Sequence, residues 1–214
     1  MSDEHVARFR VGEVALEGNL VVPQTVRGIV LFAHGSGSSR HSPRNRYVAG
    51  VLNDSGIATF LFDLLTEKEE AEDMRTGHLR FNIPLLAARV AGATDWVTED
   101  PRTQDLSIVY FGASTGAAAA LVAAADRDDI AAIVSRGGRP DLAGEALGRV
   151  KAATLLIVGG NDTQVIALNR SAQSQLRAAN ELRIVPGASH LFEEPGTLER
   201  VAKLAAEWFG RYLG

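Results

Sequence analysis

Short apolar runs rich in β-branched residues and phenylalanine recur along the chain, and segments of helical character separate them. Runs of this length and composition predict strands. The eight predicted strands are Val6–Val11, Val14–Val22, Gly28–Ala33, Ile57–Phe62, Leu106–Phe111, Ile130–Ser135, Thr154–Val158 and Leu182–Val185. The first two alternate with polar residues across Gly12-Glu13, which predicts an antiparallel hairpin. The later runs are almost continuously apolar, as expected for strands buried on both faces.

Helices are expected between these strands. The first begins at Ser42-Pro43, a cap followed by a first-turn proline, and ends at Gly56. The other predicted helices are Pro84 to about Thr98, the alanine-rich Gly116–Ala125, Gln164–Ala179, and a last helix capped by Thr197. Alternating strands and helices predict the α/β class, with a mainly parallel sheet and helices on both faces. No linker-like segment divides the chain, so we expect one domain over residues 1–214.

One charge run stands out, Glu67–Asp73, after the fourth predicted strand. Such a run predicts a solvated loop or an exposed helix. A role in covering a functional site is the alternative.

Composition narrows the functional classes. The chain has 214 residues, 46% hydrophobic and 22% charged, so a core can form and disorder is excluded as the main state. A formal net charge of −4 gives no reason to expect nucleic acid or an anionic membrane as partner. The absence of cysteine excludes disulfides, a thiolate nucleophile and thiolate zinc sites.

The N-terminal segment MSDEHVARFR has acids where a signal peptide has lysines, and the apolar runs are strand-sized. We therefore expect a soluble, cytoplasmic protein. There is no Walker motif and no cluster at metal-ligand spacing. Gly35-Ser36-Gly37 is a weak dinucleotide signal, because Arg40 replaces the third glycine. We expect neither a metal nor a cofactor.

The motif with the most chemical content is Gly112-Ala113-Ser114-Thr115-Gly116, a G-x-S-x-G sequence between a predicted strand and a predicted helix. In that position a serine can sit on a sharp turn that lifts its hydroxyl above the sheet edge. Small residues on either side leave room for the turn, and the helix N-terminus favours developing negative charge. Ser114 is therefore the candidate nucleophile, and a glycine-rich turn without catalytic role is the alternative.

A serine nucleophile requires a base and a group that orients the base. His190 follows the last predicted strand and is the only histidine after Ser114, so it is the candidate base. Asp162 follows the preceding strand in the order expected for the third member. Asp141 competes with it, although that residue is also placed to cap a helix. Asp63 precedes Ser114, which counts against it.

Acyl transfer also needs two backbone N–H groups to stabilise an oxyanion. Thr115 is expected to supply one. The second should come from the loop His34-Gly35-Ser36-Gly37, with Ser36 as first choice and Gly37 as second. We interpret His34 as a structural residue of that turn rather than as a second base.

These motifs resemble those of the α/β-hydrolases, and more closely the dienelactone-hydrolase-like branch. The match is strongest to a bacterial subgroup sometimes fused to a phosphoribosyltransferase domain, whose transferase activity is not carried over. The resembling stretches are HGSGSSRHSPRNRYVA, FDLLTEKEE, YFGASTGAAAA, VSRGGRPDLAG, LLIVGGND and GASHLFEEPG. The resemblance implies an α/β-hydrolase fold with an open, eight-stranded, mostly parallel sheet. Dienelactone hydrolases proper use cysteine where this chain has Ser114, so dienelactone is not assumed as substrate.

Together the residues predict a serine hydrolase that cleaves small carboxylic esters, with a small-molecule ester as its partner. Ser114 attacks, His190 moves the proton and Asp162 orients the imidazole. A thioesterase, an amidase or an acyltransferase on the same triad stays open, as does a non-catalytic binding module. The longest insertion, Thr66–Phe81, is too short for a large cap domain, so we expect an open site that favours short acyl groups.

Several arginines follow predicted strands and could line the site, as guanidinium groups suit carboxylate or phosphate. Candidate substrate-binding residues are Arg40, Arg136 and Arg139, and neighbouring candidates are Arg44 and Arg46. The alternative is that they pair with Asp63, Asp141 or the run Glu67–Asp73.

Overall fold

The structure is a computed structural model, and it describes residues 4–214. Residues 1–3 lie outside the described part. They belong to the expected single domain over 1–214 and to the acidic N-terminal segment. The strands are β1 (Glu4–Val11), β2 (Val14–Val21), β3 (Ile29–Ala33), β4 (Ala58–Phe62), β5 (Ile108–Ala113), β6 (Ile130–Arg136), β7 (Ala153–Gly159) and β8 (Asn180–Val185). They form one eight-stranded sheet in the order β1-β2-β4-β3-β5-β6-β7-β8.

The predicted sheet is confirmed, and each predicted strand ends within two residues of an observed one. β1 and β2 form the predicted antiparallel hairpin, and β2 also runs antiparallel to β4. All remaining neighbours are parallel. The carboxyl ends of β3 to β8 therefore meet at one edge, where a site would form.

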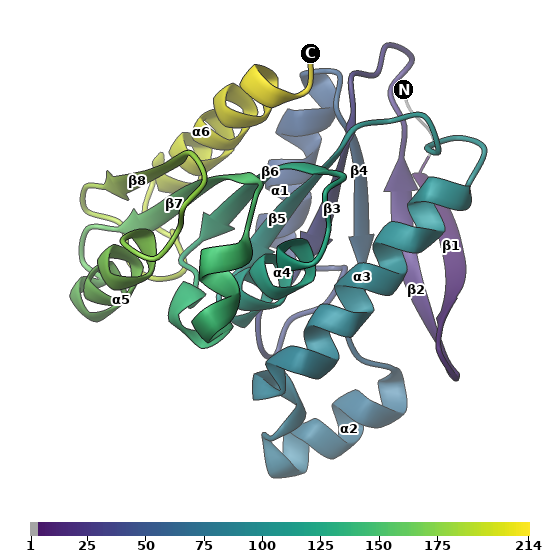
Figure 1. The fold of residues 1–214 in the computed structure, drawn as a ribbon, viewed down its shortest axis with the longest axis horizontal. Coiled ribbons are helices and arrows are strands. Elements are labelled where there is room, and N and C mark those ends of the chain that lie inside the picture. Colours follow the sequence, from purple (N-terminus) through teal and green to yellow (C-terminus); the bar gives the residue numbers. More distant parts are fainter. Residues whose placement is uncertain (1–3) are drawn as a thin grey trace.

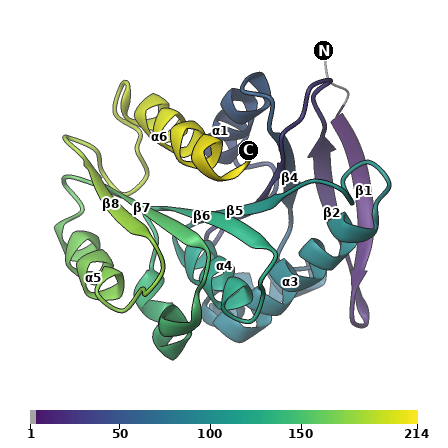
Figure 2. The ribbon, with the colours of Figure 1, turned by 45° about the horizontal axis from the view of Figure 1, so that its top comes forward.

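Helices cover both faces of this sheet (Figure 2). The α-helices are α1 (Pro43–Asp54), α2 (Glu67–Thr76), α3 (Ile83–Glu99), α4 (Thr115–Ala125), α5 (Thr163–Gln173) and α6 (Thr197–Tyr212). Two 3₁₀ segments, Leu79–Phe81 and Pro140–Arg149, complete the elements. α1 and α6 lie on one face, and α3, α4 and α5 on the other.

Strand periodicity explains the two cores. Along β3, Ile29 and Leu31 pack with the cluster under α3 and α4, whereas Val30 and Phe32 pack with the cluster under α1 and α6. All four side chains are buried, because both faces are covered. This is why the central strands read as continuous apolar runs rather than alternating ones.

One helix end differs from its prediction by more than two residues, and one predicted helix cap is wrong. α5 ends at Gln173 rather than Ala179, and the Ser174 and Asn180 side chains there donate hydrogen bonds to nearby backbone carbonyls. Such residues compete with helical hydrogen bonding. Thr197 does not cap α6 but is its first residue, while Gly196 in the left-handed region is the cap, with φ 79°.

α2 projects beyond the carboxyl edge of the sheet, below α3 (Figure 1). Thr66 and Glu69 form a reciprocal capping box at its start, and Gly77 in the left-handed region ends it. The Glu69 carboxylate also forms an ion pair with the Arg89 guanidinium of α3, at 2.7 Å. The acidic run is therefore the predicted exposed helix, held at both ends. No large cap domain interrupts the described part of the fold.

Candidate active site

Ser114 occupies a strained turn between β5 and α4. Its backbone has φ 50° and ψ −121°, a region that residues with side chains rarely adopt. Such strain costs on the order of 1–3 kcal/mol and persists where the surrounding structure enforces it. The turn leaves Ser114 at the carboxyl edge of the sheet, in line with the predicted G-x-S-x-G geometry.

The two glycines of the motif leave the room that this turn requires. A Cβ on Gly112 would lie 2.4 Å from the Cα of Ala117, within α4. A Cβ on Gly116 would lie 2.2 Å from the carbonyl oxygen of Ala33 and 2.3 Å from that of His34. Both contacts are with backbone atoms, which cannot rotate away. The close approach of β5, α4 and the β3 loop thus depends on glycine.

We expect Gly116→Ala to lower the free energy of unfolding by about 3 kcal/mol, because the added methyl overlaps two backbone carbonyls. The matched control is Gly210→Ala in α6, where a Cβ would meet nothing within 4 Å. That substitution should raise stability by about 0.5–1 kcal/mol through helix propensity. Urea unfolding of both variants measures whether each substitution raises or lowers the free energy of unfolding. Equal effects would show that the turn tolerates a side chain.

The predicted acid and base lie together. The Nδ1 of His190 is 2.6 Å from the Oδ2 of Asp162, which follows β7. Asp141, the competing acid, instead accepts two hydrogen bonds from Arg139 at 2.8 and 2.9 Å. The geometry therefore favours Asp162 as the partner of the imidazole. His190 and Ser114 line one cavity, with no hydrogen bond between them.

Close backbone packing fixes this acid–base pair. A Cβ on Gly159 would lie 2.4 Å from the carbonyl oxygen of Ser189, so the loops after β7 and β8 touch there. The Ser189 N–H donates to the Glu194 carboxylate at 3.0 Å. Backbone hydrogen bonds, first that from Ser189, lower the pKa of Glu194. Glu194 is a positioning residue that sequence analysis missed, although it lies in the quoted stretch GASHLFEEPG.

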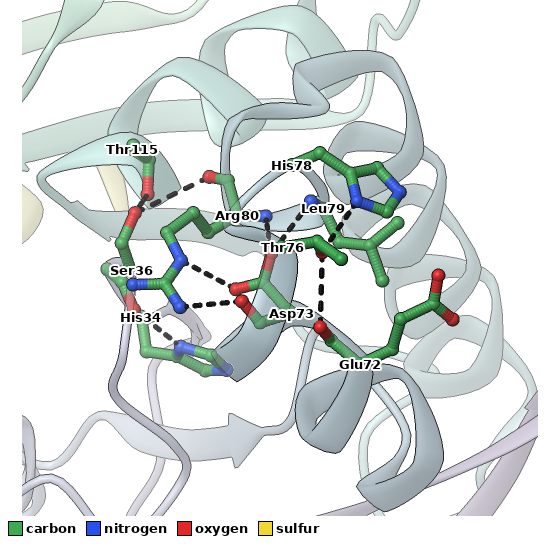
Figure 3. A network of polar contacts seen from close by, with 10 residues as sticks. His34, Ser36, Glu72, Asp73, Thr76, His78, Leu79, Arg80 and Thr115 are labelled. Atoms are coloured by element: carbon green, nitrogen blue, oxygen red, sulfur yellow. Dashed lines mark hydrogen bonds and ion pairs between the residues drawn. The ribbon is translucent and has the colours of Figure 1, made fainter.

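The two predicted oxyanion donors lie next to each other. The Ser36 Oγ is 2.9 Å from the Thr115 Oγ1, which joins the β3 loop to the start of α4 (Figure 3). Within residues 4–214, the backbone N–H groups of Ser36 and Thr115 donate no hydrogen bond. Both are therefore available to an oxyanion. The hydroxyl contact between them was not predicted.

The same network reaches α2. The Ser36 Oγ donates to the Arg80 carbonyl at 3.4 Å, and the Arg80 Nε pairs with Asp73 at 2.6 Å (Figure 3). Asp73 is the buried residue of α2 and also accepts from the N–H groups of Leu79 and Arg80. Despite its burial, these hydrogen bonds lower the pKa of Asp73. α2, although mostly exposed, thus also borders the oxyanion loop.

His34 is a structural residue of the oxyanion loop. Its Nε2 accepts the N–H of Leu64 at 3.0 Å, which leaves Nδ1 to carry the proton and donate to the Gly35 carbonyl at 3.0 Å. Burial lowers the pKa of His34, so the ring is neutral. This ring ties the loop after β3 to the end of β4 and holds the oxyanion loop in place.

We expect the stability contribution of His34 to depend on pH. As pH falls below about 6.5, the unfolded chain protonates this residue while the buried ring stays neutral, so folding becomes less favourable. In His34→Gln that contribution is absent, and the gap in unfolding free energy between the wild type and this variant should shrink from about pH 7.5 to 5.5. His41→Gln, on the surface, is the control. Parallel pH curves for the wild type and His34→Gln would contradict the assignment.

Two cavities meet at the oxyanion loop. The first lies beside Ser36 and Thr115, and its apolar surface comes mainly from Leu64, Leu65, Met74 and Leu86; its lining also includes the charged residues Asp63, Glu70, Asp73 and Arg80. We call it the apolar cavity. The second contains Ser114 and His190 and is lined by Arg44, Arg136 and Leu191. Both are formed by loops at the carboxyl edge of the sheet.

The arginines separate into two groups. Arg40 pairs with Asp63 and with Glu17, and Arg139 pairs with Asp141, so the expectation that these two bind substrate is not supported by their positions. Asp63 and Asp141 are partners that the alternative expectation named, whereas Glu17 of β2 is an additional one. Arg136 is the predicted residue that reaches the serine cavity. Arg44 also lines this cavity, and its Nη1 pairs with Glu193 at 3.4 Å.

The sheet order, the strained serine turn and the Asp162–His190 pair place this chain in the α/β-hydrolase class. Residues 16–213 match the sequence profile of the dienelactone hydrolase family. The chain therefore belongs to the dienelactone hydrolase family. In the part of the chain that the structure describes, no helix is both long and apolar enough to span a membrane.

Solved structures agree with this family. A dienelactone hydrolase from Anabaena variabilis ATCC 29413 is 63% identical, with a TM-score of 0.97 over 100% of this chain and 99% of that one. Est1E from Butyrivibrio proteoclasticus, solved with ferulic acid, is 17% identical over 97% of this chain and 99% of that one. Its TM-score of 0.82 shows the shared fold alone.

Two curated relatives are longer than this chain. Proteins named "Putative phosphoribosyl transferase", from the Mycobacterium tuberculosis strains CDC 1551 / Oshkosh and H37Rv, are each 58% identical over 214 residues. The match covers 100% of this chain and 47% of each relative. The chain thus spans about half the length of the curated relatives it matches.

Proposed function

We propose that this chain is a serine esterase that cleaves small carboxylic esters through an acyl-serine intermediate. One observation carries the proposal: the 2.6 Å contact between His190 and Asp162 lies beside a serine held at positive φ. Strained serine turns and carboxylate-oriented imidazoles are individually uncommon outside functional sites. Membership of the dienelactone hydrolase family supports hydrolytic chemistry.

In the proposed mechanism, the Ser114 hydroxyl attacks the ester carbonyl while the Nε2 of His190 accepts its proton. Asp162 holds the ring through Nδ1 and stabilises the imidazolium that forms. The tetrahedral intermediate collapses as His190 returns the proton to the departing alcohol. Water then attacks the acyl-serine by the same proton transfers, which releases the acid and restores the hydroxyl.

The negative charge of the tetrahedral intermediate needs donors that are already in place. The N–H groups of Ser36 and Thr115 supply them, and the 2.9 Å contact between their hydroxyls fixes their spacing. Thr115 also begins α4, whose N-terminus carries partial positive charge. Because His34 and the glycines hold these groups before substrate binds, little reorganisation is required.

The apolar cavity beside the oxyanion loop is the proposed acyl subsite. It ends against α2, where Met74 is 73% exposed and Asp73 closes the network with Arg80. Without a large cap domain, little further apolar surface is available to a long chain. Short acyl groups should therefore react faster than long ones.

A substrate panel tests the proposal. Ester, thioester and amide derivatives of the same butanoyl group, followed by esters of increasing acyl length, should give the highest kcat/KM for short esters. A fluorophosphonate probe should label Ser114, as mapped by peptide mass spectrometry. Labelling without turnover of any ester would favour a different acyl-transfer reaction, and absence of both would favour a binding module.

A further inference from the structure

Asp73 is a buried carboxylate on an otherwise exposed helix. It is 4% exposed and is the buried residue of α2. Its Oδ1 accepts the N–H groups of Leu79 and Arg80 at 2.7 and 3.0 Å, and its Oδ2 accepts the Arg80 Nε at 2.6 Å. A buried charge requires such partners, because its removal from water is unfavourable. One carboxylate therefore holds both the backbone and the side chain of Arg80.

Arg80 in turn contacts the oxyanion loop. Its carbonyl accepts the Ser36 Oγ at 3.4 Å, although 44 residues separate the two in the sequence (Figure 3). A carbonyl can only accept, and a serine hydroxyl has one hydrogen to donate. The 2.9 Å contact between Ser36 and Thr115 must therefore be donated by Thr115. The hydrogen bonds thus run in one direction, from Thr115 through Ser36 to the Arg80 carbonyl.

Ser36 depends on these two contacts for its position. The ring of His34 anchors the start of the loop, but Ser36 lies two residues further on and is exposed. Gly37 follows with φ 65°, and a Cβ there would meet nothing within 4 Å. Within residues 4–214, Ser36 makes no hydrogen bond besides those with Arg80 and Thr115. The direction of its backbone N–H is therefore sensitive to what its side chain contacts.

We propose that Asp73 is a positioning residue of the oxyanion hole, and that it acts through the Arg80 carbonyl on the Ser36 hydroxyl. The inference rests on the proposed esterase function, because it concerns the donors that stabilise the tetrahedral intermediate. Asp73 does not touch the reacting atoms, but it keeps the Ser36 N–H directed to the place where the oxyanion forms. Its loss should weaken the tetrahedral state and leave the binding of planar substrate nearly unchanged.

Asp73→Asn tests this role with a small change. The amide oxygen can still accept the N–H groups of Leu79 and Arg80, but the amide nitrogen would face the Arg80 Nε, donor against donor. For p-nitrophenyl butanoate, kcat should fall about tenfold, with KM within about twofold of the wild type. The hydrogen bond to Ser36 is long, so the loss should stay below the roughly 10²–10³-fold that follows removal of an oxyanion donor.

Glu72→Gln is the matched control, since it makes the same change from carboxylate to amide on the same helix. The Glu72 side chain is exposed and, within residues 4–214, forms no hydrogen bond or ion pair. Its kcat should equal that of the wild type. Arg80→Met removes the guanidinium and keeps the carbonyl, so it should lose as much kcat as Asp73→Asn. This second variant decides the outcome if Asp73→Asn does not fold.

A double-mutant cycle tests the path from Asp73 to the loop. Ser36→Ala removes the hydroxyl and keeps the backbone N–H. Asp73→Asn made in that background should therefore cause no further loss of kcat. If Asp73 only stabilised the end of α2, the two losses would add, and additive losses would overturn the inference.

Binding of a boronic acid gives a readout without turnover. Butane-1-boronic acid forms a tetrahedral adduct with a reactive serine, and ¹¹B NMR reports the tetrahedral boron, whereas butanamide is a planar comparison ligand. Asp73→Asn should weaken binding of the boronic acid by about tenfold, and binding of butanamide by less than about twofold. Equal weakening of the two ligands would indicate a general change of the site and would overturn the positioning role.

These measurements separate the inference from the esterase proposal. If the wild type forms the boronate adduct but hydrolyses no ester, and Asp73→Asn selectively weakens that adduct, the positioning role stands and the esterase proposal fails. If esters are hydrolysed and Asp73→Asn keeps the wild-type kcat and boronate affinity, the positioning role is overturned and the esterase proposal stands. A wild type that neither hydrolyses esters nor forms the adduct overturns both.

Discussion

Ser114→Ala should lower kcat for a butanoate ester by about 10⁴-fold or more, leaving the residual activity that oxyanion donors and binding supply. The reason is geometric. The turn at Ser114 holds its hydroxyl in the cavity of His190, whereas a water molecule acting as nucleophile in the variant would not be held in position. The measurement is the steady-state rate with p-nitrophenyl butanoate, beside a urea unfolding curve that verifies the fold.

Ser174→Ala is the control for this result. It removes a hydroxyl at the end of α5, where the Oγ donates to the Ser171 carbonyl at 2.8 Å, away from the serine cavity. Its activity should equal that of the wild type. An essentially active Ser114→Ala enzyme would falsify the acyl-serine mechanism, because no other residue could take over the nucleophile with the same geometry.

The second large effect concerns the acid. Asp162→Asn should lower kcat by about 10³–10⁴-fold, because a neutral amide cannot stabilise the imidazolium and also presents the wrong group to Nδ1 of His190. Asp141→Asn is the matched comparison: the same change at the competing acid, whose carboxylate pairs with Arg139. That variant should keep kcat within about threefold of the wild type.

Steady-state rates of the two variants decide between the acids. A large loss of kcat in Asp141→Asn together with a small loss in Asp162→Asn would show that Asp141, and not Asp162, orients His190. Equal losses in both would indicate that Arg139 and Asp141 support the site through the loop after β6. The 2.6 Å distance at His190 leads us to expect neither result.

Most of the sheet could be predicted because buried parallel strands have a strong local signature. β5 and β7 are short, almost wholly apolar runs that are buried on both faces, and their length and β-branched residues favour strands over helices. Helix ends were harder. At the end of α5, Asn180 donates to the carbonyls of Leu176 and Ala178, and such short-range competition is not visible in hydrophobic periodicity.

The order of Ser114, Asp162 and His190 could be predicted because each follows a strand, and parallel topology then brings the three loops to one edge. Which arginines pair with carboxylates could not be predicted. Whether a guanidinium is paired depends on which carboxylate faces it across loops, as Asp63 faces Arg40 from the end of β4. The Ser36–Thr115 contact was missed for the same reason, since 79 residues separate its partners.

The strand order also divides the site along the sequence. β5, β6, β7 and β8 are consecutive in the chain and adjacent in the sheet, so Ser114, Asp162 and His190 all come from one contiguous block. The apolar cavity, by contrast, is built almost wholly by residues 34–86. Exchange of the part of that segment that follows the oxyanion loop, which supplies Leu64, Leu65, Met74 and Leu86, would therefore remodel one subsite while leaving the reactive groups in place. A hydrolase arranged in this way can diversify its substrates without rebuilding its chemistry.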